Sequence, residues 1–201
     1  MKTFLGLAAA AALVTVVSAT TSSAAVLYAS QNDSFNQGAI VFTHPGRDNP
    51  TNALGMEDGL FLSLGLGGDA KFSFGTPTGA RFGSPGVVIE VTNGARANHV
   101  ETADIYGVNG LIETLIGSIT NSVATNMFTF SGFFTQLKLV DTSPPGSCQN
   151  PAIGFGCVGS TDGFDIDSIS VTPAPVPLPA GGLLLLTAIG GIAAMRRRKA
   201  A

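Results

Sequence analysis

The sequence is poor in the side chains that most often carry chemistry. Its 201 residues include no tryptophan, two tyrosines, two histidines and two cysteines. The hydrolase motifs G-x-S-x-G and H-E-x-x-H are both absent. With no tryptophan and only Tyr28 and Tyr106, an aromatic platform for sugar rings is also disfavoured. These shortages favour a non-enzymatic protein.

Positive charge is scarce between residues 26 and 175, where 5 basic residues against 13 acidic ones leave a net charge of −8. The five are Arg47, Lys71, Arg81, Arg96 and Lys138. A body of this charge repels nucleic acid and anionic lipid, so no nucleic-acid partner is expected. It could attract cations, although solubility outside a cell is the simpler interpretation.

Residues 1–25 are predicted to form a secretory signal peptide. Lys2 gives a positive start and residues 4–17 form an apolar run. The small residues that end at Ala25 predict cleavage before Val26. An uncleaved anchor is the alternative, but it needs about 20 apolar residues. Export implies the secretion translocon and signal peptidase as partners.

A second apolar run lies near the C-terminus. Residues 178–195 would form about 27 Å of helix, just enough to cross a bilayer core. Residues 196–201 follow as a basic tail, with Arg196, Arg197, Arg198 and Lys199. The positive-inside rule keeps this tail in the cytoplasm. The body would then lie on the far side of the membrane, in agreement with the signal peptide.

The segment before this predicted helix is rich in proline. Residues 173–177 are expected to form an extended stalk, because proline biases the preceding residue towards extended backbone. A plain linker to a plain anchor is the simplest interpretation. The run Val176-Pro177-Leu178-Pro179-Ala180, followed by the apolar run and the basic tail, resembles the VPLPA variant of the PEP-CTERM sorting signal.

This resemblance implies a destination. In that family of Gram-negative bacterial proteins, an exosortase, which is an integral-membrane protease or transpeptidase, reads the tail. The chain would be a substrate of the exosortase, anchored in the inner membrane before sorting. It would then reach the cell surface or the extracellular matrix, where extracellular polysaccharide is a further possible partner.

The body, residues 26–172, is predicted to be one all-β domain. It contains many short apolar runs with alternation and Gly/Pro-rich turns between them, which is typical of an antiparallel sandwich. No stretch has a sustained 3.6-residue period. The predicted strands are 39–43, 60–64, 71–74, 87–92, 100–107, 113–119, 126–130, 136–140 and 164–171.

The last predicted strand contains a phase slip. Phe164 and Ile166 define one face, but Ile169 and Val171 fall on the opposite one. A β-bulge near Ser168 would return them to the core side.

The body also resembles discoidin-like, galactose-binding-type jelly rolls. The resemblance rests on residues 52–75, on the strand and turn of residues 101–117, and on the closing run 162–167. It implies a jelly-roll-like β-sandwich.

Cys148 and Cys157 are the only cysteines, and they bracket a short loop. Because the chain is predicted to reach an oxidising compartment, a disulfide between them is expected. It would order the long Pro/Gly-rich segment 141–162 and stabilise the fold by roughly 2–3 kcal/mol.

Three acidic residues near the end of the body are the candidate metal ligands. Asp162, Asp165 and Asp167 could offer hard oxygen ligands to calcium. The alternative is that Asp162 caps a turn and that the other two lie on an exposed strand face.

Other patterns have simpler interpretations. The run from Gly65 to Ala70 matches a nucleotide-binding fingerprint, but a strand pattern follows it, so a β-hairpin turn is expected. His99 and Glu101 alternate onto one strand face, where they could hold a metal ion or form a proton-transfer pair. A solvent-facing polar pair is the expected interpretation.

The resulting hypothesis is a non-enzymatic exported surface or matrix protein with a C-terminal sorting signal. The alternative is a calcium-dependent carbohydrate-binding module of lectin type. A surface hydrolase is the third interpretation, since the carboxylates of Glu90, Glu101 and Glu113 could serve a glycosidase.

Overall fold

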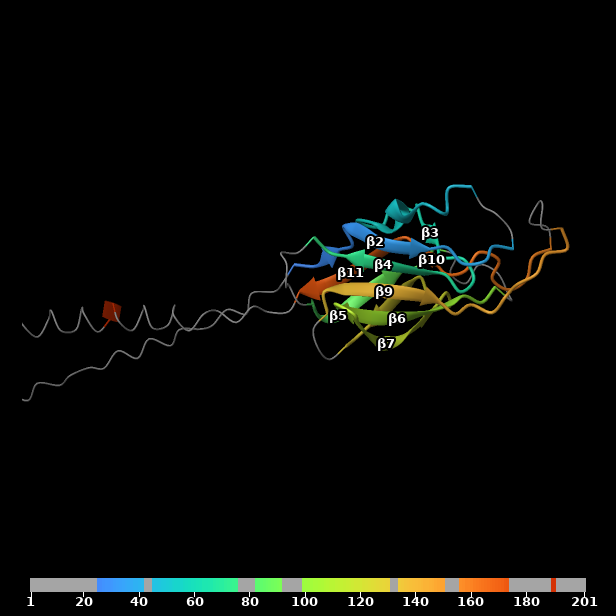
Figure 1. The fold of residues 1–201 in the computed structure, drawn as a ribbon. Helices are drawn as coiled ribbons and strands as arrows, with labels where there is room; N and C mark the ends of the chain where they lie inside the picture. The colour runs from blue at the N-terminus through green and yellow to red at the C-terminus, as the bar shows by residue number, and fades with distance from the viewer. Residues whose placement is uncertain are drawn as a thin grey trace, which may run out of the picture.

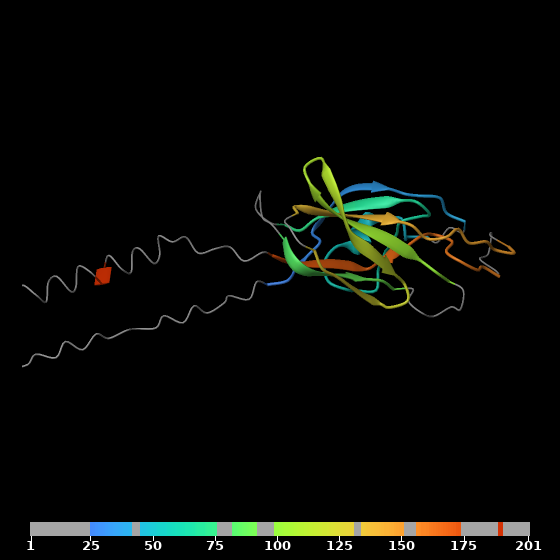
Figure 2. The same cartoon turned by 90° about the horizontal axis from the view of Figure 1, so that it is seen from below.

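The computed structural model describes residues 25–41, 45–75, 82–91, 99–130, 134–150, 156–173 and 189–190. The predicted sorting motif and basic tail, and nearly all of the signal peptide and the membrane helix, lie outside these residues. Within the described ranges, no helix is long and apolar enough to cross a bilayer. The described part of the body is an antiparallel β-sandwich (Figures 1 and 2), which confirms the predicted all-β class.

Two main sheets form the layers. The five-stranded sheet has the order β2 (Gln31–Asn36), β4 (Asp69–Ser73), β9 (Gln136–Asp141), β6 (Thr102–Asn109) and β7 (Ile112–Thr120). The four-stranded sheet has the order β1 (Leu27–Tyr28), β11 (Ser168–Pro173), β5 (Phe82–Ile89) and β8 (Thr125–Phe128). A short pair, β10 (Asp165–Ile166) with β3 (Leu62–Ser63), and the 3-10 helix η1 (Pro50–Ala53) complete the described elements.

The core lies between the layers and follows the alternation of the strands. Ala103 and Ile105 on β6 are fully buried, whereas Asp104 and Tyr106 are partly exposed, as the period-2 pattern predicts. Fully buried side chains from the other strands include Phe72, Val88, Leu137, Leu139, Ile166 and Ile169. Burying a side chain of this size stabilises the fold by roughly 1.5–3 kcal/mol.

Two phenylalanine rings pack directly on glycine backbone. A Cβ atom on Gly86 would lie 2.2 Å from the Phe128 ring, and one on Gly107 would lie 2.4 Å from the Phe134 ring. The two glycines therefore leave space in the strands for the rings between the layers.

The predicted strands near the N-terminus need correction. In the predicted strand 39–43, the described residues form only an isolated bridge from Ala39 to Leu66. The polar strand β2, by contrast, was not predicted, and it forms the edge of its sheet beside β4. The run 65–70 connects β3 to β4, and a strand follows it as expected; the two strands belong to different sheets, so it is not a hairpin turn.

The closing strand is divided between two sheets. β10 pairs with β3, whereas β11 pairs with β1 and β5. Between them, the Asp167 N–H donates to the carbonyl of Ile89 (3.0 Å). Phe164, Ile166, Ile169 and Val171 are all buried. The phase slip is therefore resolved by a change of sheet at Asp167 rather than by the predicted bulge at Ser168.

The predicted disulfide between Cys148 and Cys157 is present. It closes a ribbon in which Ser147 and Val158 exchange two backbone hydrogen bonds of 2.9 Å. The Gly146 N–H donates to the carbonyl of Ser160 (2.6 Å) at the base of this ribbon. The ribbon, which the structure describes at residues 146–150 and 156–160, thus joins the sandwich beside the closing strand.

Candidate metal centre

Three carboxylates from distant parts of the chain converge inside the sandwich. Glu90 directly follows β5, Glu101 directly precedes β6, and Asp165 lies on β10. One carboxylate oxygen from each lies within 4.8 Å of the others. All three side chains are buried, with exposed fractions of 1% or less. Among the described residues this is the only group of three or more possible ligands that converges so closely.

Asn121 fixes the approach of Glu101. The Asn121 Oδ1 accepts from the Glu101 N–H (3.0 Å), and the Asn121 N–H donates to the Glu101 carbonyl (3.0 Å). The Asn121 Nδ2 donates to the carbonyl of His99 (3.1 Å). The Glu90 N–H donates to the carbonyl of Ala124 in the same turn (2.8 Å). Backbone geometry therefore directs both glutamates inward.

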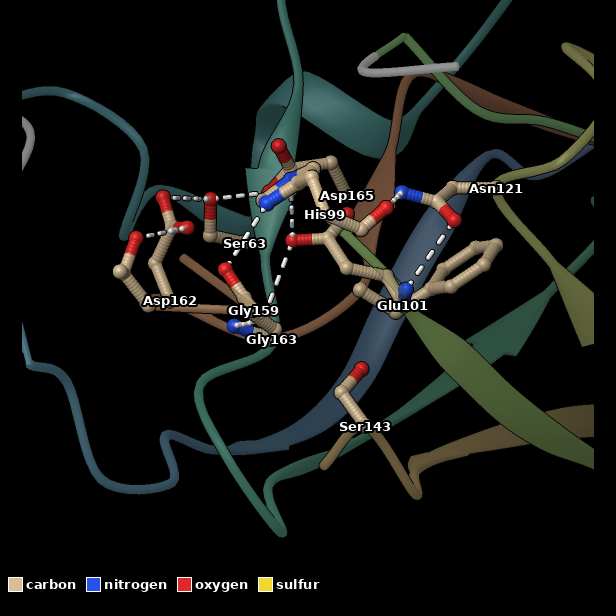
Figure 3. Close-up of polar contacts among 12 residues, drawn as sticks. Ser63, His99, Glu101, Asn121, Ser143, Gly159, Asp162, Gly163 and Asp165 are labelled. Atoms are coloured by element: carbon tan, nitrogen blue, oxygen red, sulfur yellow. Dashed lines mark hydrogen bonds and ion pairs between the residues drawn. The ribbon is translucent and has the colours of Figure 1, made fainter. Parts of the chain in front are cut away.

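Glu101 accepts from two further groups (Figure 3). His99 Nε2 lies 3.0 Å from its Oε1, and the Ser160 hydroxyl donates to the same oxygen (3.1 Å). His99 Nδ1 also lies 3.0 Å from the carbonyl oxygen of Gly159. Because carbonyl oxygens and ionised carboxylates only accept hydrogen bonds, the imidazolium form of His99 satisfies both contacts. His99 thus joins Glu101 to the disulfide-closed ribbon.

The prediction that His99 and Glu101 form a solvent-facing pair is therefore wrong. The two side chains do interact, but Glu101 is fully buried and His99 is 12% exposed. Asn121 and Ser160 of the ribbon both form hydrogen bonds with Glu101. Period-2 alternation along one strand cannot predict contacts with residues from other segments.

Asp165 has an incompletely satisfied carboxylate. Its Oδ1 accepts from the Ser63 hydroxyl, whereas its buried Oδ2 has no hydrogen-bond partner among the described residues. Burial raises the pKa of Asp165 well above its usual range, and the charges of Glu101 and Asp162 raise it further. The hydrogen bond from Ser63 and the charge of Arg47 oppose this rise. Burying a carboxylate oxygen that accepts no hydrogen bond costs free energy unless a proton or a cation binds to it.

The other two predicted metal ligands have different partners. Asp162 Oδ2 lies 3.0 Å from Arg47 Nη1, whose guanidinium lies 4.5 Å from the centre of the Phe61 ring. Asp167 accepts from the backbone N–H groups of Asp58 (3.1 Å) and Gly59 (3.0 Å). The exposed strand face considered for Asp165 and Asp167 is wrong, because both are buried.

Asp141 is a further buried carboxylate that sequence reasoning missed. Its oxygens accept from the N–H groups of Gly67 (2.9 Å) and Phe164 (2.8 Å) and from the Ser143 hydroxyl (2.6 Å). These bonds hold two loops together at the end of β9. Because Asp141 is saturated with donors, it is a structural group rather than a ligand.

The donor set suits a hard cation. All three converging side chains offer oxygen only, which is the preference of calcium rather than of zinc or copper. Calcium–oxygen distances of about 2.3–2.6 Å place two ligand oxygens up to about 5 Å apart. The 4.8 Å limit on the separations fits one shared ion. Glu90, Glu101 and Asp165 would supply the side-chain ligands, and backbone carbonyls would complete the coordination.

One sequence signal could have located this centre. Glu90 interrupts the apolar run from Val87 to Val91, which is the usual position of a core residue. A charged residue is almost never fully buried unless it is paired or bound to a metal. The convergence of Glu90 with Glu101 and Asp165, however, depends on strand pairing across the whole domain.

No protein-family profile and no curated protein matches the chain. The solved structures that are similar to it include three that match over about three quarters of its length. A truncated AlyQ with CBM32 and alginate lyase domains shares 11% identity over 77% of this chain, at a TM-score of 0.44. This chain covers only 36% of that structure.

The other two similar structures are described as carbohydrate-binding modules. The family 32 CBM from C. perfringens NanJ in complex with galactose shares 16% identity, over 73% of this chain and 98% of that one, at a TM-score of 0.42. The GH31 CBM32-2 bound to GalNAc shares 10% identity, over 75% and 99% of the chains, at a TM-score of 0.35. TM-scores below 0.5 do not assign the chain to a family.

Proposed function

We propose that this chain is a non-enzymatic β-sandwich domain, exported and displayed outside the cell, whose fold is completed by a calcium ion. The observation that carries the calcium-bound fold is the buried carboxylate cluster of Glu90, Glu101 and Asp165. The export and display rest on the two ends of the sequence.

Burial argues against catalysis at this cluster. A glycosidase needs two carboxyl groups on either side of a bond in a bound sugar. Glu90 and Glu101 have exposed fractions of 1% and 0%, so a sugar in solvent does not reach them. Glu113, the third glutamate considered, lies on β7 and binds lysines. The cluster is better suited to a structural ion than to a reaction.

Calcium would remove an electrostatic conflict in the closing region. The cluster joins the end of β5, the start of β6 and β10, so one ion would tie the closing strand to both layers. Without a cation, burial raises the pKa of Asp165 most, and the charges of Glu101 and Asp162 raise it further. Binding to the folded state alone would stabilise the protein by roughly 2.7 kcal/mol at a hundredfold excess over the dissociation constant.

The display outside the cell is supported by the order of sequence features. A signal peptide, the motif from Val176 to Ala180, an apolar run and a basic tail follow one another as in exosortase substrates. The chain would be held in the inner membrane until the exosortase processes it. The surface or the extracellular matrix of a Gram-negative cell would be its final place.

Thermal melting of the full chain with calcium and with a chelator tests the ion site. We expect a higher melting temperature with calcium. Asp165→Asn should abolish most of this rise without lowering the melting temperature in chelator, because it removes a buried charge together with the ligand. Asp48→Asn is the matched control, since it removes the same charge at an exposed position. Equal melting temperatures with calcium and chelator in the unmodified chain would reject the ion.

Carbohydrate binding is the second candidate function, and the observation that favours it is a row of side chains on the outer face of the five-stranded sheet. Register places Lys71, Lys138 and Tyr106 opposite one another on β4, β9 and β6. A tyrosine ring beside charged hydrogen-bonding groups is a combination that suits a sugar.

A glycan array with Tyr106→Ala as control tests this second candidate. Because the carboxylate cluster is buried, calcium would act on binding through the fold rather than by touching the sugar. We therefore expect a chelator to weaken binding only where it also lowers the melting temperature. The absence of glycan binding at any calcium concentration would reject this candidate and leave the structural ion intact.

A further inference from the structure

The tip of the β6–β7 hairpin exposes aliphatic side chains where a turn normally carries polar ones. Asn109 pairs with Ile112, so Gly110 and Leu111 form a two-residue loop. Gly110 has a φ of 65°, the left-handed conformation that such loops require. Leu111 is completely exposed and Ile112 is 68% exposed. Adjacent exposed aliphatic side chains at the end of a hairpin are able to contact an apolar partner.

The hairpin tip lies at the end of the sandwich from which the chain continues to the predicted membrane segment. Val108 pairs with Gln136, and Ser73 pairs with Gln31, so the tip shares its end of the sheet with the crossing from β1 to β2. Figure 2 shows the yellow-green hairpin tip on the left of the sandwich, the side at which the orange-red strand β11 ends at Pro173. In Figure 1 the arrow of β11 also points to the left of the view.

The length of chain beyond the sandwich limits its distance from a bilayer. The last strand of the sandwich ends at Pro173, and only four residues separate it from the apolar run that begins at Leu178. Four extended residues span about 12 Å at about 3.1 Å each. A body tethered this closely meets the bilayer with the end that carries Leu111 and Ile112.

We propose that the hairpin tip, Gly110 to Ile112, docks into the surface of the lipid bilayer to which the predicted C-terminal segment tethers the chain. The inference rests on the proposed membrane-anchored stage. Two aliphatic side chains would bind a membrane only weakly by themselves, but the tether makes this contact intramolecular and raises its effective concentration. Docking would fix the orientation of the body before the exosortase acts.

Charge near the tip is compatible with a zwitterionic surface. Glu113, next to Ile112, lies 3.0 Å from Lys138 Nζ and 3.5 Å from Lys71 Nζ, so its charge is compensated. The strongly acidic body disfavours an anionic surface. The occupant is therefore the interface of a zwitterionic bilayer.

The absence of tryptophan from the chain allows a direct test. Leu111→Trp introduces a single fluorophore at the tip, and Val123→Trp introduces one in the turn at the opposite end of β7, where Val123 is 51% exposed. Each full-length variant is reconstituted into phosphatidylcholine vesicles with and without acyl-chain-brominated lipid. We expect the tryptophan at position 111 to emit at shorter wavelength and to be quenched by bromine. The tryptophan at position 123 should behave as in water.

Vesicle flotation separates the possible failures. A chain that floats with the vesicles but shows equal, water-like emission at both positions overturns the docking and leaves the anchor intact. A chain that does not float overturns the anchor and the docking with it. A shorter-wavelength emission at position 111 that bromine does not quench indicates self-association of the tips, which also overturns the docking.

Discussion

Glu113 connects two lysines on the outer face of the five-stranded sheet. Its Oε2 lies 3.0 Å from Lys138 Nζ, and its Oε1 lies 3.5 Å from Lys71 Nζ. The hydrogen bond from Lys138 is the main cause of a pKa below the usual 4.5, and Lys71 contributes as well. The folded state therefore favours the ionised carboxylate.

Glu113→Gln should lower the free energy of unfolding by less than about 1 kcal/mol near neutral pH, because the group is partly exposed and screened by solvent. The lowered pKa means that this stability is present above pH 4.5 and is lost as the pH falls below it. The difference between variant and unmodified chain should thus disappear at low pH. Urea unfolding at a series of pH values measures it.

Glu57→Gln is the control for this prediction. Glu57 is exposed and has no hydrogen bond or ion pair with another described residue, so its loss should have no effect at any pH. A Glu113 effect that persists at acidic pH would show that charge is not its cause.

For single residues, the sequence predicted alternation along a strand better than it predicted the contacts of each side chain. The alternation along β6 separates Ala103 and Ile105 from Asp104 and Tyr106, and only the structure shows that the first pair lies in the core. The partners of Asp165 could not be predicted, because Ser63 and Glu101 are distant in sequence and are brought to it by strand pairing. A buried carboxylate and an exposed one look alike until the strands beside them are known.

The disulfide-closed ribbon is the element that links the carboxylate cluster to the surface of the body. His99 bonds to Gly159, and Ser160 bonds to Glu101, so the base of the ribbon holds one wall of the cluster. The ribbon is in turn closed by Cys148 and Cys157.

Cys148→Ser combined with Cys157→Ser should lower the free energy of unfolding by roughly 2–3 kcal/mol, since the loop closure is lost. It should also reduce the rise in melting temperature produced by calcium, because Ser160 and His99 would no longer be held against Glu101. Calorimetry with and without calcium measures both effects.

Chemical reduction of the unmodified chain provides an independent comparison, because it opens the same bond without a substitution. A calcium-induced rise of equal size in the oxidised, reduced and doubly substituted chains would contradict the coupling between ribbon and cluster.

Strands with one buried face were predicted from their hydrophobic alternation. Strands that are held mainly by backbone hydrogen bonds, without a buried face, were not predicted. The runs in β4 and β9 alternate and were predicted with small boundary errors. β2 carries mostly polar residues at a sheet edge, so no hydrophobic pattern marks it. The division of the closing strand into β10 and β11 was visible as a phase slip, but its cause was a change of sheet.

For the molecule as a whole, the antiparallel sandwich followed from composition and turn spacing, whereas the order of its strands did not. Leu27 pairs with Val171, and Ser168 pairs with Ile89, so partners lie far apart in sequence. Local patterns contain no information on such pairs. The ends of the chain, by contrast, are defined by local sequence features, and they stay predictions.

Intact-mass measurement of the protein from its native host tests these ends. We expect a mature species that begins at Val26, carries one disulfide and has lost the segment after the sorting motif. In a host without its exosortase, the C-terminal segment should stay attached and the protein should remain in the membrane fraction. Unchanged surface release in that host would refute the sorting assignment.

The position of β11 determines when the domain is able to fold. β11 lies inside its sheet, between β1 and β5, although it is the last strand of the sandwich. The four-stranded sheet and the carboxylate cluster cannot be completed until residues 165–173 have left the ribosome, because they contain β11 and Asp165. Because long-range β pairing is slow, we expect the sandwich to be completed only after synthesis of β11. If the chain is exported as proposed, it would reach the translocon in a threadable form and complete its structure only after crossing.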